Sequence, residues 1–378
     1  MIQLSKKRSK RNPRVGEPYT PSSEKMLRQE AKTAVVLMNM GGPDDQESVK
    51  PFLFNLFSDP DIIKLPLSFI FQKLLAWVIV TKRGDEAKEN YAKMGGGSPQ
   101  LPITREQAEA LNKALAEQHE KDWLVDIAMR YWHPFTEETL KELKEKGVEQ
   151  LVLTTLYPHF SYTTTGSNLN EIKRVLKRLD WDVPITVVAG YSKEDWYLES
   201  LAECIQTGLE NGDWSCPIED VQILFSAHSL PMKHLKRTKD PYQKLIERCA
   251  ADVMEQHFPQ HRWDLAYQSK VGNMPWLGPA TEGVLSFYAG KSIDNILVVP
   301  VSFVSDHVET LVEIDLDYLT WAREEGVQFI SRAPVMNTQA QFIDGLAQRI
   351  VSQVARRSDT GSEAGVVSDA RPEEVLLS

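Results

Sequence analysis

The chain contains few cysteines, and their spacing argues against the common cysteine-based metal sites. Only Cys204, Cys216 and Cys249 occur in 378 residues, and no two of them form a CxxC pair. The sequence therefore carries no zinc or iron–sulfur motif. Such sparse cysteines are typical of a protein from a reducing compartment.

Signatures of nucleotide and nucleic-acid binding are also missing. No GxGxxG sequence follows the first predicted strand, which argues against nicotinamide chemistry. The stretch Gly95-Gly96-Gly97-Ser98-Pro99 is similar to a phosphate loop but lacks the Walker lysine and threonine. A formal net charge of −10 gives no indication of a nucleic-acid partner.

No apolar run is long enough to cross a bilayer, because charged residues and prolines interrupt the most apolar segment, residues 52–80. Its apolar side chains cover more than one helical face, which predicts either ordinary core or a lip that contacts a membrane or covers a ligand. The basic N-terminal stretch is followed by no apolar run and is no secretory signal. We therefore predict a disordered extension over residues 1–31 and a disordered tail over residues 357–378.

What the sequence does contain is a regular alternation of strand patterns and helical patterns, which predicts an α/β fold with parallel sheets. Four strands fall in residues 32–195 and four in residues 196–356, so we predict two similar domains that face each other across a cleft. The predicted strands are residues 34–40, 124–131, 151–157, 185–191, 221–227, 264–270, 296–303 and 327–333.

A histidine follows the fifth predicted strand, in the stretch Phe225-Ser-Ala-His228-Ser-Leu-Pro231. Ligand sites in open α/β sheets lie outside the carboxyl ends of the strands, where this residue is placed. A lone histidine at such a place is often only a hydrogen-bonded structural residue. A second polar cluster with His307 and Glu309 follows the seventh strand, however, and we expect the two strand ends to share one cleft.

Carboxylates recur every fourth residue after this second cluster, at Glu309, Glu313 and Asp317, so they form one stripe on a helix. No Lys or Arg occurs from Asp306 to Trp321, so the stripe is predicted to be unpaired. Glu309 has the spacing of a capping box with Asp306 as the N-cap, and a solvated face is a second simple interpretation. The third is a path for cations or protons, because imidazole and carboxylate together suit divalent metals such as Fe²⁺.

Other residues are suited to a large flat aromatic ligand with carboxylates at its edge. Met40, Tyr131 and Trp276 offer apolar or aromatic contact, together with the apolar segment. The cationic and hydroxyl groups that suit the carboxylates are Arg83, Arg130, Ser98 and Ser269.

These motifs resemble the ferrochelatase family and run in the family's order over roughly residues 33–350. Phe-Ser-Ala-His-Ser-Leu-Pro followed by Asp-Pro-Tyr is highly specific for it. The similar segments are residues 37–43, 95–99, 130–138, 163–167, 224–231 with 240–242, 268–279 and 305–318.

The resemblance implies a chelatase-like fold, in which two Rossmann-like domains, each with a parallel four-stranded sheet flanked by helices, hold a porphyrin between them. The implied enzyme is a lyase that inserts Fe²⁺ into protoporphyrin IX to form protohaem, the terminal step of haem biosynthesis. The resemblance assigns the metal and proton chemistry to His228 and Glu309. It also assigns an acidic relay of His307, Glu313 and Asp317, a porphyrin pocket of Met40, Phe57, Arg83, Ser98, Arg130, Tyr131, Ser269 and Trp276, and an active-site lip over residues 52–80.

Two departures from the family pattern matter. Members with an iron–sulfur cluster have C-terminal cysteines and a further cysteine where this chain has Tyr162, and no cysteine follows Cys249 here. We therefore predict no iron–sulfur cluster and no tightly bound cofactor, with Fe²⁺ as a substrate. The segment from Pro231 to Asp240 is one residue longer and more basic than the usual form, which leaves its conformation open.

The expected partners are a porphyrin, ferrous iron and a membrane surface, with the oxidase that forms the porphyrin as a further candidate and no nucleic acid. We expect a cytoplasmic location, peripheral to the inner face of the membrane, in preference to the mitochondrial matrix. The alternatives are a coproporphyrin III ferrochelatase, a porphyrin or haem carrier without catalysis and, more distantly, a cobalt chelatase. Met40, where coproporphyrin-type relatives tend to carry tyrosine, and the apolar lip favour protoporphyrin.

Overall fold

The computed structural model describes residues 32–63, 68–118, 122–272 and 274–360. The predicted extension over residues 1–31 and the predicted tail from residue 361 lie outside this part of the chain. The last helix, α11, runs from Ala340 to Thr360, so the first four residues of the predicted tail are helical. Once a helix is formed, each added residue gains a hydrogen bond at little cost, which carries it into a polar sequence.

Two parallel four-stranded sheets form the centre of the molecule, as the sequence predicted. The first has the strand order β2-β1-β3-β4 and the second the order β6-β5-β7-β8. Each sheet therefore has its first strand in the interior. The strands are β1 Thr33–Asn39, β2 Trp123–Met129, β3 Gln150–Thr155, β4 Ile185–Val188, β5 Gln222–His228, β6 Trp263–Gln268, β7 Asn295–Pro300 and β8 Phe329–Arg332.

All eight predicted strands are present, but most of them end earlier than predicted. The fourth, for example, ends at Val188 rather than at Tyr191, although Ala189 and Tyr191 are still buried. The apolar pattern reports burial, and burial continues after the backbone has left the hydrogen-bonded ladder. The short non-strand segments that result lie at the carboxyl edges of the sheets, where polar side chains converge.

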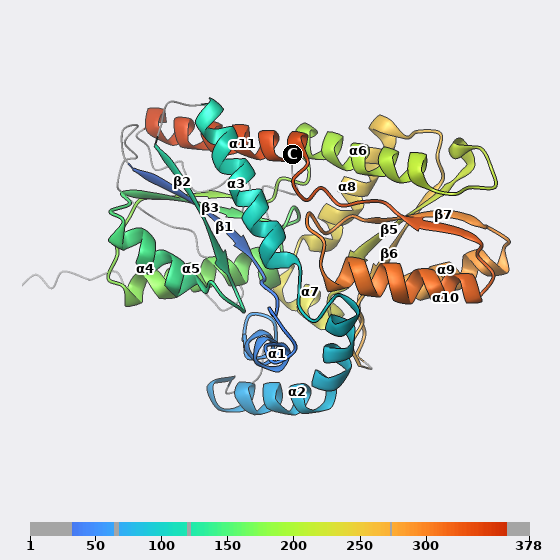
Figure 1. Ribbon diagram of the computed structural model, residues 1–378, viewed down its shortest axis with the longest axis horizontal. Helices are drawn as coiled ribbons and strands as arrows, with labels where there is room; N and C mark the ends of the chain where they lie inside the picture. Colours follow the sequence, from blue (N-terminus) through green and yellow to red (C-terminus); the bar gives the residue numbers. More distant parts are fainter. Residues whose placement is uncertain (1–31, 64–67, 119–121, 273, 361–378) are drawn as a thin grey trace, which may run out of the picture.

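Helices of the first half cover its sheet and extend beyond it. They are α1 Val49–Phe57, α2 Ser68–Lys93, α3 Gln100–Gln118, α4 Thr136–Glu145, η1 Tyr162–Gly166 and α5 Ser167–Arg178. Figure 1 shows α1 and α2 together below both sheets, away from the layers that the other helices form. These two helices and the turn that follows α1 contain the described part of the segment predicted to be a lip.

Helices of the second half flank its sheet in the same manner, except α11, which packs on α3 and β4 of the first half and on α6. They are α6 Asp195–Asn211, η2 Ile218–Asp220, α7 Met232–Thr238, α8 Tyr242–His257, α9 Thr281–Gly290, η3 Glu309–Tyr318, α10 Leu319–Glu324 and α11. Of these, η3 is a π-helix that continues directly into α10. Among the described helices, none is both long and apolar enough to cross a membrane.

One continuous apolar core joins the two halves, which holds the two carboxyl edges in a fixed relation. It includes Leu37 and Val152 of the first sheet and Phe225 and Val299 of the second. The helix α11 packs on α3 and β4 of the first half and on α6 of the second, and Figure 1 shows it along the top of the first half, next to α6. Burial of this shared apolar surface stabilises the arrangement by about 25 cal/mol per Å² removed from water.

Candidate active site

His228 is the last residue of β5, and its backbone is fixed on both sides. Its N–H donates to the Ser302 hydroxyl at 3.1 Å, and its carbonyl accepts from the Tyr242 hydroxyl at 3.0 Å. The imidazole Nδ1 lies 2.8 Å from a carboxylate oxygen of Glu309, the first residue of η3. The two predicted strand-end clusters therefore meet in one site, with side chains 36% and 20% exposed.

The capping interpretation of Glu309 is wrong. The backbone N–H of Asp306 donates to Asn337 and not to Glu309. It is the Thr310 hydroxyl that stabilises this turn, because it accepts from the His307 N–H at 3.0 Å and donates to the Asp306 carboxylate at 2.9 Å. The Glu309 carboxylate is thus free of any capping role and binds His228 instead.

The carboxylate stripe lies on a π-helix, which the sequence did not predict. Hydrogen bonds from residue i to i+5 put more residues into each turn than in an α-helix. Side chains four residues apart therefore lie closer to one line, and Glu309, Glu313 and Asp317 form a row along η3. We call these three residues the carboxylate row.

The expectation that the row is unpaired is also wrong, because most of its partners come from other elements. Glu313 accepts from the Ser269 N–H at 2.7 Å, from the Gln268 amide at 3.1 Å and from the Tyr318 hydroxyl at 2.7 Å. The Ser269 hydroxyl lies within hydrogen-bond distance of both Glu309 and Glu313 and donates its single proton to one of them at a time. Asp317 pairs with the Lys93 ammonium of α2 at 3.1 Å.

Burial and neighbouring charges shift the pKa values of His228, Glu309 and Glu313 in different directions. Burial lowers the pKa of His228, but the charge of Glu309, the hydrogen bond to it and the charge of Glu313 outweigh burial, so the pKa lies above its ordinary value. Burial opposes ionisation of Glu309 as well, yet His228 holds the Glu309 pKa well below its usual range. At Glu313, burial and the charge of Glu309 raise the pKa. Groups with separated pKa values in one site are suited to holding and passing protons.

His307 lies near this site but outside the row. Its ring packs edge-on against Phe303 with centroids 4.5 Å apart, and its buried Nδ1 has no hydrogen-bond partner among the described residues. Burial lowers the pKa of His307. The two histidines therefore differ, because His228 carries a carboxylate partner and His307 is held neutral.

The other predicted site residues occupy several places. Ser269 is central, with positive φ, between Glu309 and Glu313. Trp276 is in the loop that follows, where its indole N–H donates to the Val271 carbonyl at 2.9 Å. Arg83 contacts Glu86 on its own helix at 3.5 Å, and Phe57 is the last residue of α1.

Met40 and Ser98 lie where the loops after β1 and α2 meet the end of β2. The Met40 carbonyl accepts from the Tyr131 N–H at 2.9 Å, and the Ser98 N–H donates to the Pro43 carbonyl at 2.7 Å. A Cβ added to Gly42 would lie 2.5 Å from Ser98, so only glycine permits this approach.

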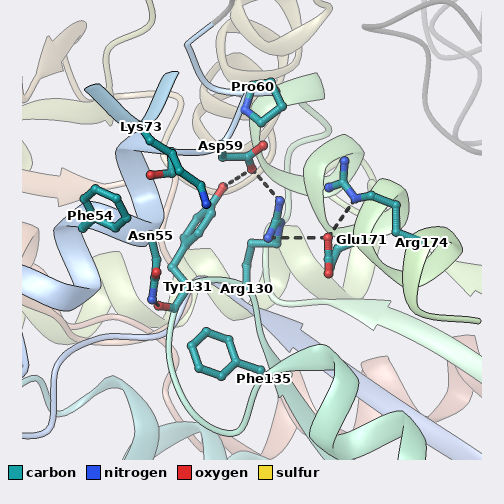
Figure 2. Close-up of a pocket in the computed structure, with 11 residues that line it drawn as sticks. Phe54, Asn55, Asp59, Pro60, Lys73, Arg130, Tyr131, Phe135, Glu171 and Arg174 are labelled. Atoms are coloured by element: carbon teal, nitrogen blue, oxygen red, sulfur yellow. Dashed lines mark hydrogen bonds and ion pairs between the residues drawn. The ribbon is translucent and has the colours of Figure 1, made fainter. Parts of the chain in front are cut away.

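Arg130 and Tyr131 are bound by a carboxylate that sequence reasoning missed as a functional group. Asp59, in the turn after α1, accepts from the Arg130 guanidinium at 2.9 Å, from the Tyr131 hydroxyl at 2.7 Å and from the Ser167 hydroxyl at 2.5 Å. Figure 2 shows both side chains directed at this carboxylate from the edge of a cavity of about 380 Å³. The buried Asp59 thus joins the turn that follows α1 to β2 and α5.

We expect Asp59→Ala to destabilise the protein by about 3–5 kcal/mol, because it removes the closest partner of the buried Arg130 charge and leaves the longer ion pair with Glu171 at 3.9 Å. The free energy of unfolding in urea measures this loss. The matched control is Asp85→Ala, which breaks the exposed pair with Lys50 and is expected to cost about 0–1 kcal/mol. Equal losses in the two variants would show that Asp59 is no anchor.

The segment whose conformation the sequence left open is the short helix α7. It ends at Thr238 and is followed by Lys239, which has the left-handed φ of 53°. Next to it the buried Asp240 carboxylate accepts from the Ser161 hydroxyl at 2.8 Å and the Tyr162 N–H at 2.9 Å, and it pairs with His234 at 3.2 Å. Asp240 therefore ties the two halves together close to Tyr242, which supports His228.

An imidazole, a row of carboxylates and a hydroxyl that links them are the ligands and proton acceptors that a divalent metal reaction requires. They stand at the carboxyl edge of the second sheet, where α/β folds bind ligands. Such an arrangement can accept protons and offer ligands to a divalent metal.

Comparison with known proteins identifies the family. The ferrochelatase family model matches residues 32–354. A ferrochelatase of Gloeothece citriformis is 43% identical over 88% of this chain and 85% of its own length, and one of Synechocystis is 42% identical over 85% and 83%. A chloroplastic ferrochelatase-2 of Arabidopsis thaliana is 41% identical over 88% of this chain and 65% of its own length.

Among solved structures, SirB from Bacillus subtilis with Fe³⁺ aligns over 87% of this chain and 97% of its own, with a TM-score of 0.49 and 12% identity. The sequence matches decide the assignment, and the chain belongs to the ferrochelatase family. It is a metal chelatase of the lyase class, and its substrates are a porphyrin and ferrous iron.

Proposed function

We propose that the porphyrin is protoporphyrin IX and that the reaction forms protohaem. Met40, where coproporphyrin-type relatives tend to carry tyrosine, supports this choice over coproporphyrin III, as do the apolar helix α1 and the apolar N-terminal half of α2. The observation that carries the mechanism is the 2.8 Å pair of His228 and Glu309 between β5 and η3.

The reaction exchanges two pyrrole protons for one ferrous ion. His228 is the base in this proposal, because its Nδ1 faces Glu309 while its Nε2 makes no hydrogen bond to another described residue. An imidazole with a pKa near neutrality accepts a proton and releases it again under physiological conditions. Glu309 stabilises the imidazolium that forms, and both groups contact the metal.

The carboxylate row then offers a route between the ring and the solvent. Glu309 is ionised, and Glu313 has a raised pKa and accepts hydrogen bonds from Gln268, Ser269 and Tyr318, so a proton or a cation passes between groups of different proton affinity. Asp317 is partly exposed at the outer end. His307 remains a neutral neighbour of the site in this proposal.

The test of the substrate is direct. Purified protein and Fe²⁺ are mixed with protoporphyrin IX in one reaction and with coproporphyrin III at the same concentration in a parallel reaction. The absorbance of the metalloporphyrin is followed in both. We expect faster turnover of protoporphyrin IX. Faster turnover of coproporphyrin III would reverse the assignment, and porphyrin binding without any insertion would support a carrier.

We also propose that α2 contacts a membrane, from which the poorly soluble porphyrin arrives. Phe71, Leu74 and Trp77 are 46%, 57% and 60% exposed and recur every third residue, so they form one apolar face. With this membrane contact we propose a cytoplasmic protein that is peripheral to the membrane. We also propose that it holds no resident iron–sulfur cluster, since buried Tyr162 stands at the position of a cluster cysteine.

The triple variant Phe71→Ser, Leu74→Ser, Trp77→Ser is expected to lose at least about tenfold in partitioning to neutral phosphatidylcholine vesicles, because burial of each apolar side chain contributes about 1.5–3 kcal/mol. Vesicle flotation measures the partitioning. The control is Ile218→Ser, Phe287→Ser, which removes exposed apolar residues of the second half. Unchanged flotation of the triple variant would leave α2 as a cover for the ligand only.

A further inference from the structure

The C-terminal turn of α2 lies along the carboxylate row. Lys93, the last residue of α2, reaches Asp317 at 3.1 Å although the two are 224 residues apart. Two residues earlier, Tyr91 is buried, and the charge of Glu309 at the inner end of the row contributes to raising its pKa. Figure 1 shows the end of α2 directed toward the continuous helix formed by η3 and α10.

The three members of the row differ in what balances their charge. Glu309 faces the imidazole of His228, and Glu313 is surrounded by neutral donors. Asp317 alone is balanced by a lysine, and within the described part of the chain no other Lys or Arg forms an ion pair with the row. Lys93 is therefore a full positive charge at the outer end.

This charge is positioned so that it can be displaced. The side chains of Lys93 and Asp317 are 42% and 46% exposed, so water screens the pair and its contribution to folding is small. A divalent cation offers Asp317 twice the charge of an ammonium group and accepts several oxygen ligands. Lys93 and an incoming ferrous ion therefore compete for the same carboxylate.

We propose that Lys93 is a positioning residue that occupies the outer end of the carboxylate row, and that ferrous iron must displace it from Asp317 to enter. The lysine then sets the concentration of metal at which the enzyme works. This inference rests on the proposed role of the row in metal entry.

The test is Lys93→Met, which removes the charge and keeps the length of the side chain. With detergent-solubilised porphyrin, we expect the KM for Fe²⁺ to fall about two- to fivefold, with kcat and the KM for porphyrin within twofold of wild type. Lys93→Arg keeps the charge and is expected to keep the wild-type KM for metal. The control is Lys82→Met, an exposed lysine of the same helix outside the row.

A merely structural pair would give the opposite pattern. If Lys93 only holds the two halves together, Lys93→Met raises the KM for metal or lowers the urea midpoint of unfolding, and the proposal is overturned. An unchanged KM for metal also overturns it. In the background of Asp317→Asn, Lys93→Met is expected to have no further effect, since the contested carboxylate is gone.

Failure of this inference is distinguishable from failure of the proposed function. Wild-type protein that inserts no metal would refute the function itself. An active wild type with unchanged activity in Glu313→Gln would show that the row is not the route, and Lys93 would then have no competitor. Active wild type, impaired Glu313→Gln and an unaltered Lys93→Met would refute the role of the lysine alone.

Discussion

Replacing His228 by alanine is expected to abolish metal insertion while the fold and porphyrin binding persist. Loss of one positioned acid–base group costs about 10²–10⁴-fold in rate. We expect the upper end of this range, because the same imidazole is proposed to contact the metal. Steady-state metalloporphyrin formation measures the loss.

The structure gives the reason why the fold tolerates His228→Ala. The side chain is about one-third exposed, and the residue's structural bonds to Ser302 and Tyr242 come from its backbone, which alanine retains. Glu309 keeps the hydroxyl of Ser269 as a donor. A thermal midpoint close to wild type, with porphyrin still bound, is therefore part of the prediction.

The matched control is His257→Ala, which removes an exposed histidine at the end of α8. It is expected to retain full activity. A tenfold loss or less in His228→Ala would assign the base to another group, with His307 as the next candidate because its pKa keeps it neutral.

The second large effect is expected for Glu309→Gln. This change keeps the size of the side chain but removes the charge that stabilises the imidazolium, and we expect kcat to fall by about 10²-fold or more. Asp317→Asn, at the outer end of the row, is expected to lose less. Glu324→Gln, an exposed glutamate on α10, is the control and is expected to leave kcat unchanged.

The pH dependence of Glu309→Gln separates charge from shape. In the wild type the Glu309 charge raises the pKa of His228, and the imidazole acts as a base only above that pKa. Removing the charge lowers this pKa, so the acidic limb of kcat/KM should move to lower pH. An acidic limb that stays in place, together with near-normal kcat, would show that the 2.8 Å pair has no part in the reaction.

The architecture could be predicted from the sequence because the apolar pattern of a strand and its burial coincide in parallel sheets. Strands such as Leu151 to Thr155 are buried on both faces, so they read as short apolar runs between helical patterns. The positions at which the strands end could not be predicted, because a residue such as Tyr191 is buried by tertiary packing after its strand has ended. The π-helical form of η3 was missed for a similar reason, since its periodicity differs little from that of an α-helix over three carboxylates.

Part of the candidate site could also be predicted from the sequence. His228 and Glu309 each follow an apolar strand, and the carboxyl ends of parallel strands converge at one edge, so their proximity was predictable. Asp59 carried one usable signal, a carboxylate within an apolar segment. Its partners Arg130 and Tyr131 are more than 70 residues away, so nothing local indicated that it binds them.

The sequence by itself thus determined two parallel α/β halves, a histidine and a carboxylate row at strand ends, and the ferrochelatase family to which the chain belongs. Only the tertiary structure decided which groups balance each charge. Asp317 was predicted to be unpaired because its helix contains no cation, yet Lys93 of α2 pairs with it. The physical reason is that charge pairing acts through space over a few ångströms and is independent of separation along the chain, whereas strand and helix patterns are properties of neighbouring residues.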